Sequence, residues 1–145
     1  MKTKNRIFQY QLLLIGVLFM LLINQANNCY GQTSQEYFKK GMAKKERKNY
    51  KGAMADFNKA IELNSKMVEA YLGRAIVKDH LDNYLGAVSD CNKAIEIDSI
   101  IADAYYIRGF TKLKMKQFDN GCLDLSKAEE LGNVEAKEVI KKHCK

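Results

Sequence analysis

The feature that most constrains the fold is a segment that recurs at a fixed spacing. NYKGAMADFNKAIELNS, residues 49–65, is followed 34 positions later by NYLGAVSDCNKAIEIDS, residues 83–99, with eleven of the seventeen residues identical. A weaker third copy follows at the same spacing, in which Phe118, Asp124 and Ala128 stand in register with the second copy. A fixed period of about 20 to 50 residues indicates stacked supersecondary units, because one unit alone cannot bury its apolar face.

Each copy is preceded by a further segment with helical periodicity. These segments are QEYFKKGMAKKER, EAYLGRAIVKDHL and DAYYIRGFTKLKM. The chain has no Pro, no Trp and only nine Gly, and it is rich in helix formers, so the class is all-α. We therefore predict three helix hairpins that turn near Asn49, Asn83 and Gln117 and that cover residues 34–67, 68–101 and 102–135.

A last helix is predicted at residues 134–144, VEAKEVIKKHC. Apolar Ala136, Val139 and Ile140 share one side of it, and lysines occupy the other. A stack of repeats needs a closed end, so this segment is expected to be a solvated capping helix.

This pattern resembles that of tetratricopeptide repeat (TPR) proteins, and the chain is identified as a member of an exported bacterial type. Small residues stand where the helices of that family approach closely, and tyrosines occupy its large aromatic position. These residues are Gly41, Ala75, Gly109, Ala53, Ala87, Gly121, Tyr37, Tyr71 and Tyr105. The resemblance implies a right-handed α-solenoid of three TPR hairpins plus the capping helix, in one domain over residues 32–145.

The sequence departs from the family signature in two ways. Basic residues replace its Leu and Tyr, and we expect their methylene stems to pack on apolar neighbours while the charges stay in water. They are Lys40, Arg74, Arg108, Lys44, Lys78 and Lys112. The signature Pro is replaced by Ser65, Ser99 and Asn133, and the LNS and IDS turns are expected to supply N-capping oxygens for the next helices.

In TPR proteins the first helices line a concave groove that usually holds a peptide or a partner's helix. The resemblance assigns to this groove an apolar set, Phe38, Met42, Leu72, Ile76, Tyr106, Phe110 and Leu113. Chaperone-binding members use Lys and Asn to clamp a carboxylate, and this chain has Phe38, Met42, Gly73, Asp103 and Ile107 at those places. We therefore expect recognition of an amphipathic helix or an extended apolar segment. The alternative is that these side chains pack on one another inside the stack, or on residues 32–36.

Residues 1–31 differ from the rest of the chain. MKTKNRIFQYQ carries three basic residues and no acidic one, and it precedes an uncharged run from Leu12 to Ile23. This run is shorter than the ~20 residues of a membrane span and fits a secretory signal peptide, with cleavage expected before Gln32. Lipidation at Cys29 and an uncleaved N-terminal anchor remain open, and either would associate the chain with a membrane. Each alternative predicts export, to the periplasm, the envelope or the medium.

Two cysteines lie at equal distances from the last expected turn. Cys122 and Cys144 are each eleven residues from residue 133, so an antiparallel helix pair would bring them level. Outside the cytoplasm they are predicted to form a disulfide, worth about 3 kcal/mol in the chain-entropy model; the alternative is two unpaired thiols. With His143 they would still lack a fourth metal ligand and paired C-x-x-C spacing, so no metal is expected. Cys91, at the signature Phe site, is expected to pack as a small hydrophobe.

Part of the positive net charge of the chain comes from residues 1–31. The formal net charge is +7, and without residues 1–31 it is +4, with 21 basic against 17 acidic residues. The remaining excess lies in residues 39–51, which fit an anionic surface or simply a solvated helix face. Nucleic acid is not an expected partner, because no other basic face accompanies this cluster.

No motif for catalysis or cofactor binding is present in the sequence. It contains no phosphate-binding Gly loop, no G-x-S-x-G and no H-E-x-x-H. We therefore expect neither an enzyme nor a cofactor, but a protein–protein interaction module outside the cytoplasm with a protein or peptide partner. The alternative is a self-assembling envelope lipoprotein, a homo-oligomer anchored through Cys29.

Overall fold

The computed structural model describes residues 14–18 and 33–144. Residues 14–18 are helical, and the signal-peptide prediction for residues 1–31, with Cys29 and the expected cleavage site, otherwise lies outside the described residues. In neither described range does a helix have the length and apolar character needed to cross a membrane.

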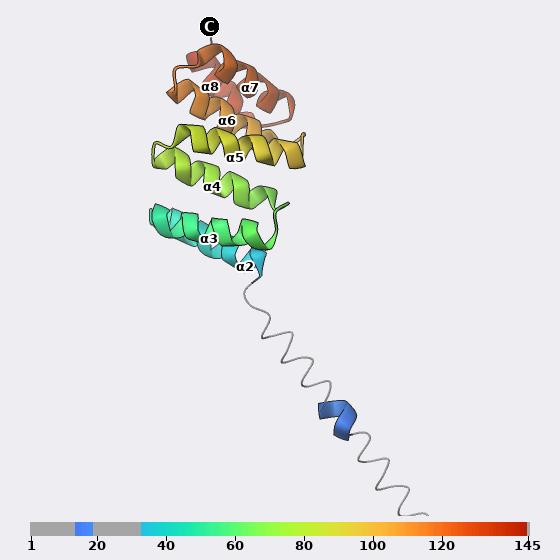
Figure 1. Ribbon diagram of the computed structural model, residues 1–145. Helices are drawn as coiled ribbons and strands as arrows, with labels where there is room; N and C mark the ends of the chain where they lie inside the picture. The colour runs from blue at the N-terminus through green and yellow to red at the C-terminus, as the bar shows by residue number, and fades with distance from the viewer. Residues whose placement is uncertain (1–13, 19–32, 145) are drawn as a thin grey trace, which may run out of the picture. The chain divides into compact units, whose positions relative to one another are not determined.

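Residues 33–144 fold into helices and short turns, without a strand. The helices are α2 (Ser34–Glu46), α3 (Tyr50–Leu63), α4 (Val68–His80), α5 (Tyr84–Ile97), α6 (Ala102–Lys114), α7 (Phe118–Glu130) and α8 (Val134–His143). They form three successive hairpins followed by one helix, stacked in chain order (Figure 1). The predicted all-α solenoid of hairpins is confirmed. The last helix ends at His143, one residue earlier than predicted, and Cys144 is its C-cap.

The stack curves because its two sets of helices are spaced differently. The first helices of the hairpins contact each other in sequence, α2 with α4 and α4 with α6, and α6 in turn contacts α8. Among the described helices, α3, α5 and α7 make no such contacts with each other and reach only first helices or α8. Since the first helices approach one another more closely, they line the concave side.

The turns within the hairpins repeat in conformation as well as in sequence. Lys48, Asp82 and Lys116, 34 residues apart, have φ values of 58°, 57° and 60°. Two backbone bonds close each turn; in the first, Asn49 N donates to Lys44 O and Lys48 N to Lys45 O, both at 2.9 Å. This is the Schellman arrangement that ends a helix with a left-handed residue. Asn49 then caps α3, since its Oδ1 accepts from Gly52 N at 3.0 Å.

The prediction that the LNS and IDS turns supply capping oxygens for α4 and α6 is wrong. α4 and α6 begin after Met67 and Ile101, whose side chains make no capping bond, because the turn runs two residues past each serine. Asn64 and Asp98 instead fold the turns, accepting from the backbone N–H two residues on at 3.1 Å. The serines contribute their carbonyls, which accept from the hydroxyls of Tyr71 and Tyr105 at 3.2 Å.

Large and small residues exchange places between equivalent core positions of successive repeats, so the core is filled in both. In the first hairpin, Phe57 is fully buried and its ring lies against Gly41 and Gly73. One repeat later Cys91 takes the place of the ring, and Ala75 and Ile107 pack against it where the first site has glycines. Cys91 therefore packs as a small hydrophobe, as predicted.

Candidate functional site

The seven residues assigned to the groove lie on the first helices, but they differ in exposure. Four pack inside the stack and three are accessible. Leu72 and Leu113 are each only 8% exposed, and both belong to internal clusters. Phe38 and Met42 are half-buried and pack on the Phe57 cluster, with the Phe38 and Phe57 ring centroids 6.0 Å apart. For these four side chains, packing within the stack is an evident role.

Three of the seven residues offer accessible apolar surface on the first helices. Tyr106 and Phe110 on α6 stack with ring centroids 6.2 Å apart, and Phe110 is 36% exposed. Ile76 on α4 and Tyr106 line an open hollow of about 290 Å³, together with Leu72 and Ile107. The four apolar residues that line the hollow come from two successive repeats, on α4 and α6.

Polar residues from α6 and α8 complete this hollow. They are Asp103, Asn133 and Glu135. Asn133 Nδ2 donates to Asp103 Oδ1 at 3.0 Å, while Asn133 Oδ1 accepts from Ala136 N at 2.9 Å and caps α8. Asn133 and Glu135 were not among the predicted groove residues, because the last helix was expected only to cap the stack. Asn133 could have been predicted from the sequence as the N-cap of the last helix, because Asn is a preferred residue at a helix start.

The other end of the concave surface carries a polar bridge between repeats. Thr111 Oγ1 on α6 donates to Asp79 Oδ1 on α4 at 3.0 Å, and Lys114 pairs with the other oxygen of Asp79. The Lys114 ammonium also lies 5.2 Å from the centroid of the Phe110 ring. This lysine charge is therefore balanced within the stack.

Buried carboxylates neutralise the basic residues that replace the family's Leu and Tyr. Arg108 forms a two-point pair with Asp124, at 2.9 Å and 2.6 Å, and Lys112 reaches the same carboxylate at 2.7 Å. Asp124 is 7% exposed, and its hydrogen bond raises the pKa of Arg108. Arg74 and Lys78 repeat the arrangement on Asp90. The expectation that these charges stay in water is therefore wrong for the second and third hairpins, because each faces an Asp on the paired helix.

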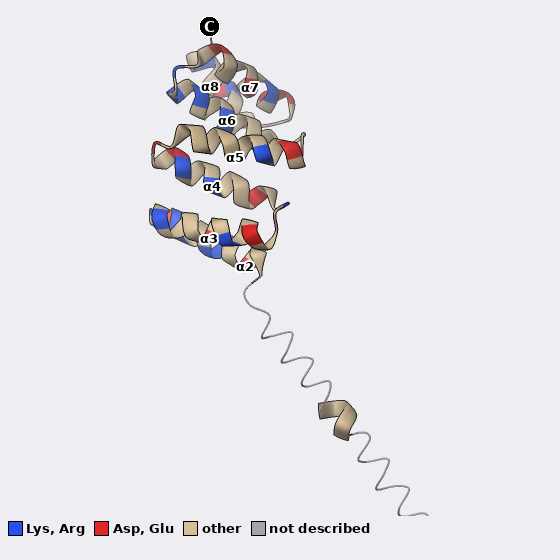
Figure 2. Cartoon of the chain, viewed as in Figure 1, with Lys and Arg blue, Asp and Glu red and all other residues tan. Residues whose placement is uncertain are grey.

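The first hairpin holds a weaker version of this arrangement. Lys44 Nζ lies 2.7 Å from Asp56 Oδ2, within ion-pair distance but without hydrogen-bond geometry. Lys40, at the position of Arg74, instead lies over the Tyr37 ring, 5.7 Å from its centroid. Figure 2 shows the basic residues along α2 and toward its turn into α3, where Lys39, Lys40, Arg47, Lys48 and Lys51 are exposed.

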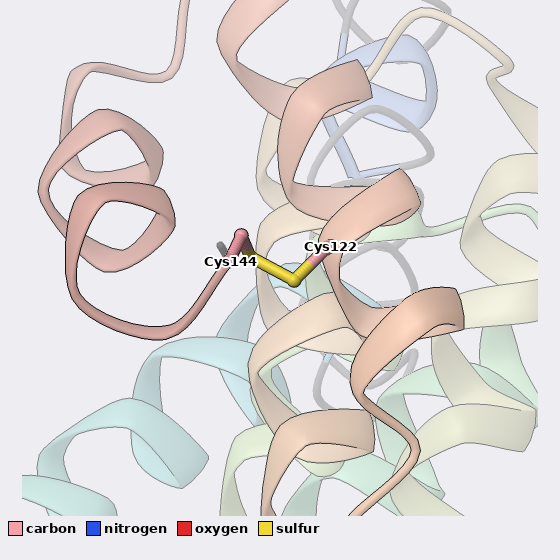
Figure 3. Close-up of a disulfide and its surroundings, with 2 residues drawn as sticks. All are labelled: Cys122 and Cys144. Carbon is pink, nitrogen blue, oxygen red and sulfur yellow. A yellow bond between two sulfur atoms is a disulfide. The ribbon is translucent and has the colours of Figure 1, made fainter.

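A disulfide joins α7 to the end of α8 (Figure 3). It links Cys122 and Cys144, the pair singled out in the sequence, with Cα atoms 5.7 Å apart. Within the described residues Cys91 is the free cysteine, and burial raises the pKa of its thiol to about 12. A thiol in this state is unreactive, so Cys91 has a packing role. No cluster of three or more potential metal ligands occurs in the described ranges.

Comparison with known proteins finds one matching family model and several similar solved structures. Residues 37–67 match the model of the tetratricopeptide repeat. The first TPR of Spaghetti (RPAP3) bound to the HSP90 peptide SRMEEVD is similar in structure, with a TM-score of 0.73 and 23% identity over 77% of this chain and 90% of that chain. The Arabidopsis OM64 TPR domain has a TM-score of 0.73 and 28% identity, and the match covers 77% of this chain and 93% of that chain. MamA has a TM-score of 0.66 and 24% identity, and the match covers 72% of this chain and 61% of that chain. No curated protein matches the sequence. Residues 37–67 therefore match one tetratricopeptide repeat, and residues 33–144 share the fold of these solved TPR domains.

Proposed function

We propose that this chain is a non-catalytic interaction module that binds a peptide or a partner's helix on its concave surface. The observation that carries the proposal is the accessible apolar surface of Ile76, Tyr106 and Phe110, which lies on first helices beside an open hollow. Solved relatives support it, since the RPAP3 domain holds an HSP90 peptide and the TPR2B domain of yeast Sti1 is in complex with pHsp70.

The chemistry of the bound segment is proposed to differ from that of the RPAP3 peptide. SRMEEVD carries three acidic residues. The hollow here has Asp103 and Glu135 on its rim and an apolar floor. Like charges would repel such a peptide, so an apolar or amphipathic segment fits this surface better.

We further propose that the module acts outside the cytoplasm. Support comes from the basic and apolar leader in residues 1–31, and from the Cys122–Cys144 pair, since disulfides persist in oxidising compartments. Intact mass of the protein from its native host distinguishes the forms: a chain that starts at Gln32, a lipid-modified Cys29, or an uncleaved leader. A chain that keeps its leader and stays in the cytoplasm would contradict export.

The test of binding is selection from a random displayed-peptide library on the folded protein. The selected peptide is then titrated against Tyr106→Ala and Phe110→Ala, which should each weaken binding at least about tenfold if these rings are anchors. Leu85→Ala is the matched control, because Leu85 is 73% exposed on α5 and its loss should leave affinity unchanged. Failure to select any peptide, or equal losses in all three variants, would contradict the proposal.

Self-association on the concave surface is the competing function. Sedimentation over a range of concentrations separates the two: a monomer at all concentrations leaves the surface free for a foreign segment. A dimer that Phe110→Asp dissociates would instead assign the surface to a second copy of the chain.

A further inference from the structure

We infer that the hollow between α4, α6 and α8 receives a lysine or arginine side chain, so that the segment bound on the concave surface is basic as well as apolar. This inference rests on the proposed function and adds the chemistry of the partner. Lysine and arginine combine a long apolar stem with a cationic head, and the hollow offers a matching surface to each part.

The floor of the hollow suits the stem. Leu72 and Ile76 come from α4, and Tyr106 and Ile107 from α6, so the floor spans two repeats. Its volume of about 290 Å³ exceeds what a single methylene chain needs, and the site is open on the solvent side. A stem that lies across this floor replaces water over apolar surface, which is favourable.

The rim of the hollow suits the head. Asp103 and Glu135 are both exposed, and within residues 33–144 neither makes an ion pair. Asn133 bonds to Asp103 and caps α8 at once, so it fixes the start of α8, which carries Glu135, against the start of α6. Glu69 occupies the equivalent position on α4, 34 residues before Asp103, and is also exposed.

The arginines and lysines of α4 and α6 are already paired with carboxylates. Arg74 and Lys78 pair with Asp90, Arg108 and Lys112 pair with Asp124, and Lys114 pairs with Asp79. None of these side chains lines the hollow. The charge presented to a ligand at this site is therefore negative, although the chain as a whole is basic.

The two acidic residues also have a local role in their own helices, and the experiment distinguishes this role from ligand binding. Asp103 and Glu135 both lie in the first turns of their helices, where carboxylates interact favourably with the helix dipole. A purely local role predicts a loss of helix stability on neutralisation and no change in the choice of ligand.

The experiment is selection from the same random-peptide library, on full-length wild-type protein and on Asp103→Asn/Glu135→Gln. Asn at residue 103 keeps an acceptor for Asn133, so the variant should retain its fold, which circular dichroism checks. The wild type should enrich Lys or Arg at one position of the selected peptides. The double variant should lose that enrichment and bind the wild-type peptide about three- to tenfold more weakly, as expected for two exposed charge pairs.

Two further variants sharpen the result. Glu62→Gln/Glu96→Gln changes the net charge equally on exposed second-helix pairs and should keep the preference for basic residues. Asp103→Lys/Glu135→Lys should reverse the preference to Asp or Glu. Selected peptides without Lys or Arg, or a preference that survives neutralisation, would overturn the inference while leaving the interaction module intact. Failure of every protein to select a peptide would overturn both.

Discussion

The ring of Phe57 occupies the space in which a side chain at Gly73 would lie. A Cβ atom at residue 73 would be 2.7 Å from Phe57 Cζ. A Cβ atom at residue 41 would likewise be 2.7 Å from Phe57 Cε1. The contact between the first two hairpins therefore depends on one aromatic ring between two glycines.

Gly73→Ala should destabilise the protein by about 1 to 3 kcal/mol, even though Ala is the better helix former, because the added methyl overpacks the interface. Urea unfolding of Gly73→Ala, Phe57→Leu and the double variant measures the coupling. The double variant should be more stable than the two single losses predict when added together. Strict additivity would show that the ring and residue 73 do not compete for the same space.

The next interface should respond to overpacking in the same way. Cys91→Phe places a ring where Ala75 and Ile107 leave room for a thiol, so it should cost about 1 to 3 kcal/mol. Adding Ile107→Gly recreates the room present at Gly73, and the double variant should recover part of that loss. Thermal unfolding of the two variants is sufficient, and a double variant less stable than Cys91→Phe would contradict the volume exchange.

Equivalent aspartates should contribute unequally along the stack. Asp124→Asn leaves Arg108 and Lys112, whose side chains are 18% and 19% exposed, without their partner and should cost about 3 kcal/mol. Asp56→Asn affects one lysine that is 41% exposed and should cost about 1 kcal/mol or less. Denaturant midpoints at equal slope give both values. Equal losses would mean that the buried pairs add nothing beyond the single exposed contact.

The disulfide should stabilise the end of the stack specifically. Its two cysteines are 22 residues apart in sequence, and in the chain-entropy model loss of the bond costs about 3 kcal/mol. Cys122→Ser/Cys144→Ser should therefore lower the free energy of unfolding and remove hydrogen-exchange protection first in α8. Protection in α4 and α5 serves as the internal control. Uniform loss of protection in all helices would contradict a local role.

Cys91 should make stability pH-dependent in alkaline solution. Burial raises the pKa of this thiol from 9.0 to about 12. Between pH 9 and 12 the unfolded chain therefore releases a proton that the folded chain keeps, so stability falls as pH rises through this window. The difference in stability between wild type and Cys91→Ala should shrink by about 1 kcal/mol from pH 8 to pH 10. A constant difference would contradict the raised pKa.

Much of the fold could be predicted because the information is periodic. The 34-residue spacing specifies hairpins, and the equal distances of Cys122 and Cys144 from residue 133 identified the pair that the structure joins. The turns were less predictable. A serine next to a helix start resembles a cap, but the residue that occupies the cap depends on turn length, and here it is Met67 or Ile101.

The site was harder to predict than the fold. The spacing of residues along a helix indicates which side chains share a face, but not which other elements cover that face. Leu72 and Ile76 share a face at a spacing of four residues, yet Leu72 belongs to a buried cluster and Ile76 remains half-exposed. The pairing of Arg108 with Asp124 joins residues sixteen apart on different helices, so it depends on the rotation of both. Asn133 and Glu135 enter the hollow only because α8 packs beside α6.

Nuclear magnetic resonance mapping of a selected peptide on isotope-labelled protein shows most directly where a partner binds. Binding on the concave surface predicts shift changes that centre on Ile76, Tyr106 and Phe110 and extend to Asp103 and Glu135, with little change on the outward-facing residues of α3 and α5. Changes confined to those outer helices, with Ile76 and Phe110 unaffected, would contradict the central claim that the concave surface is where this protein binds its partner.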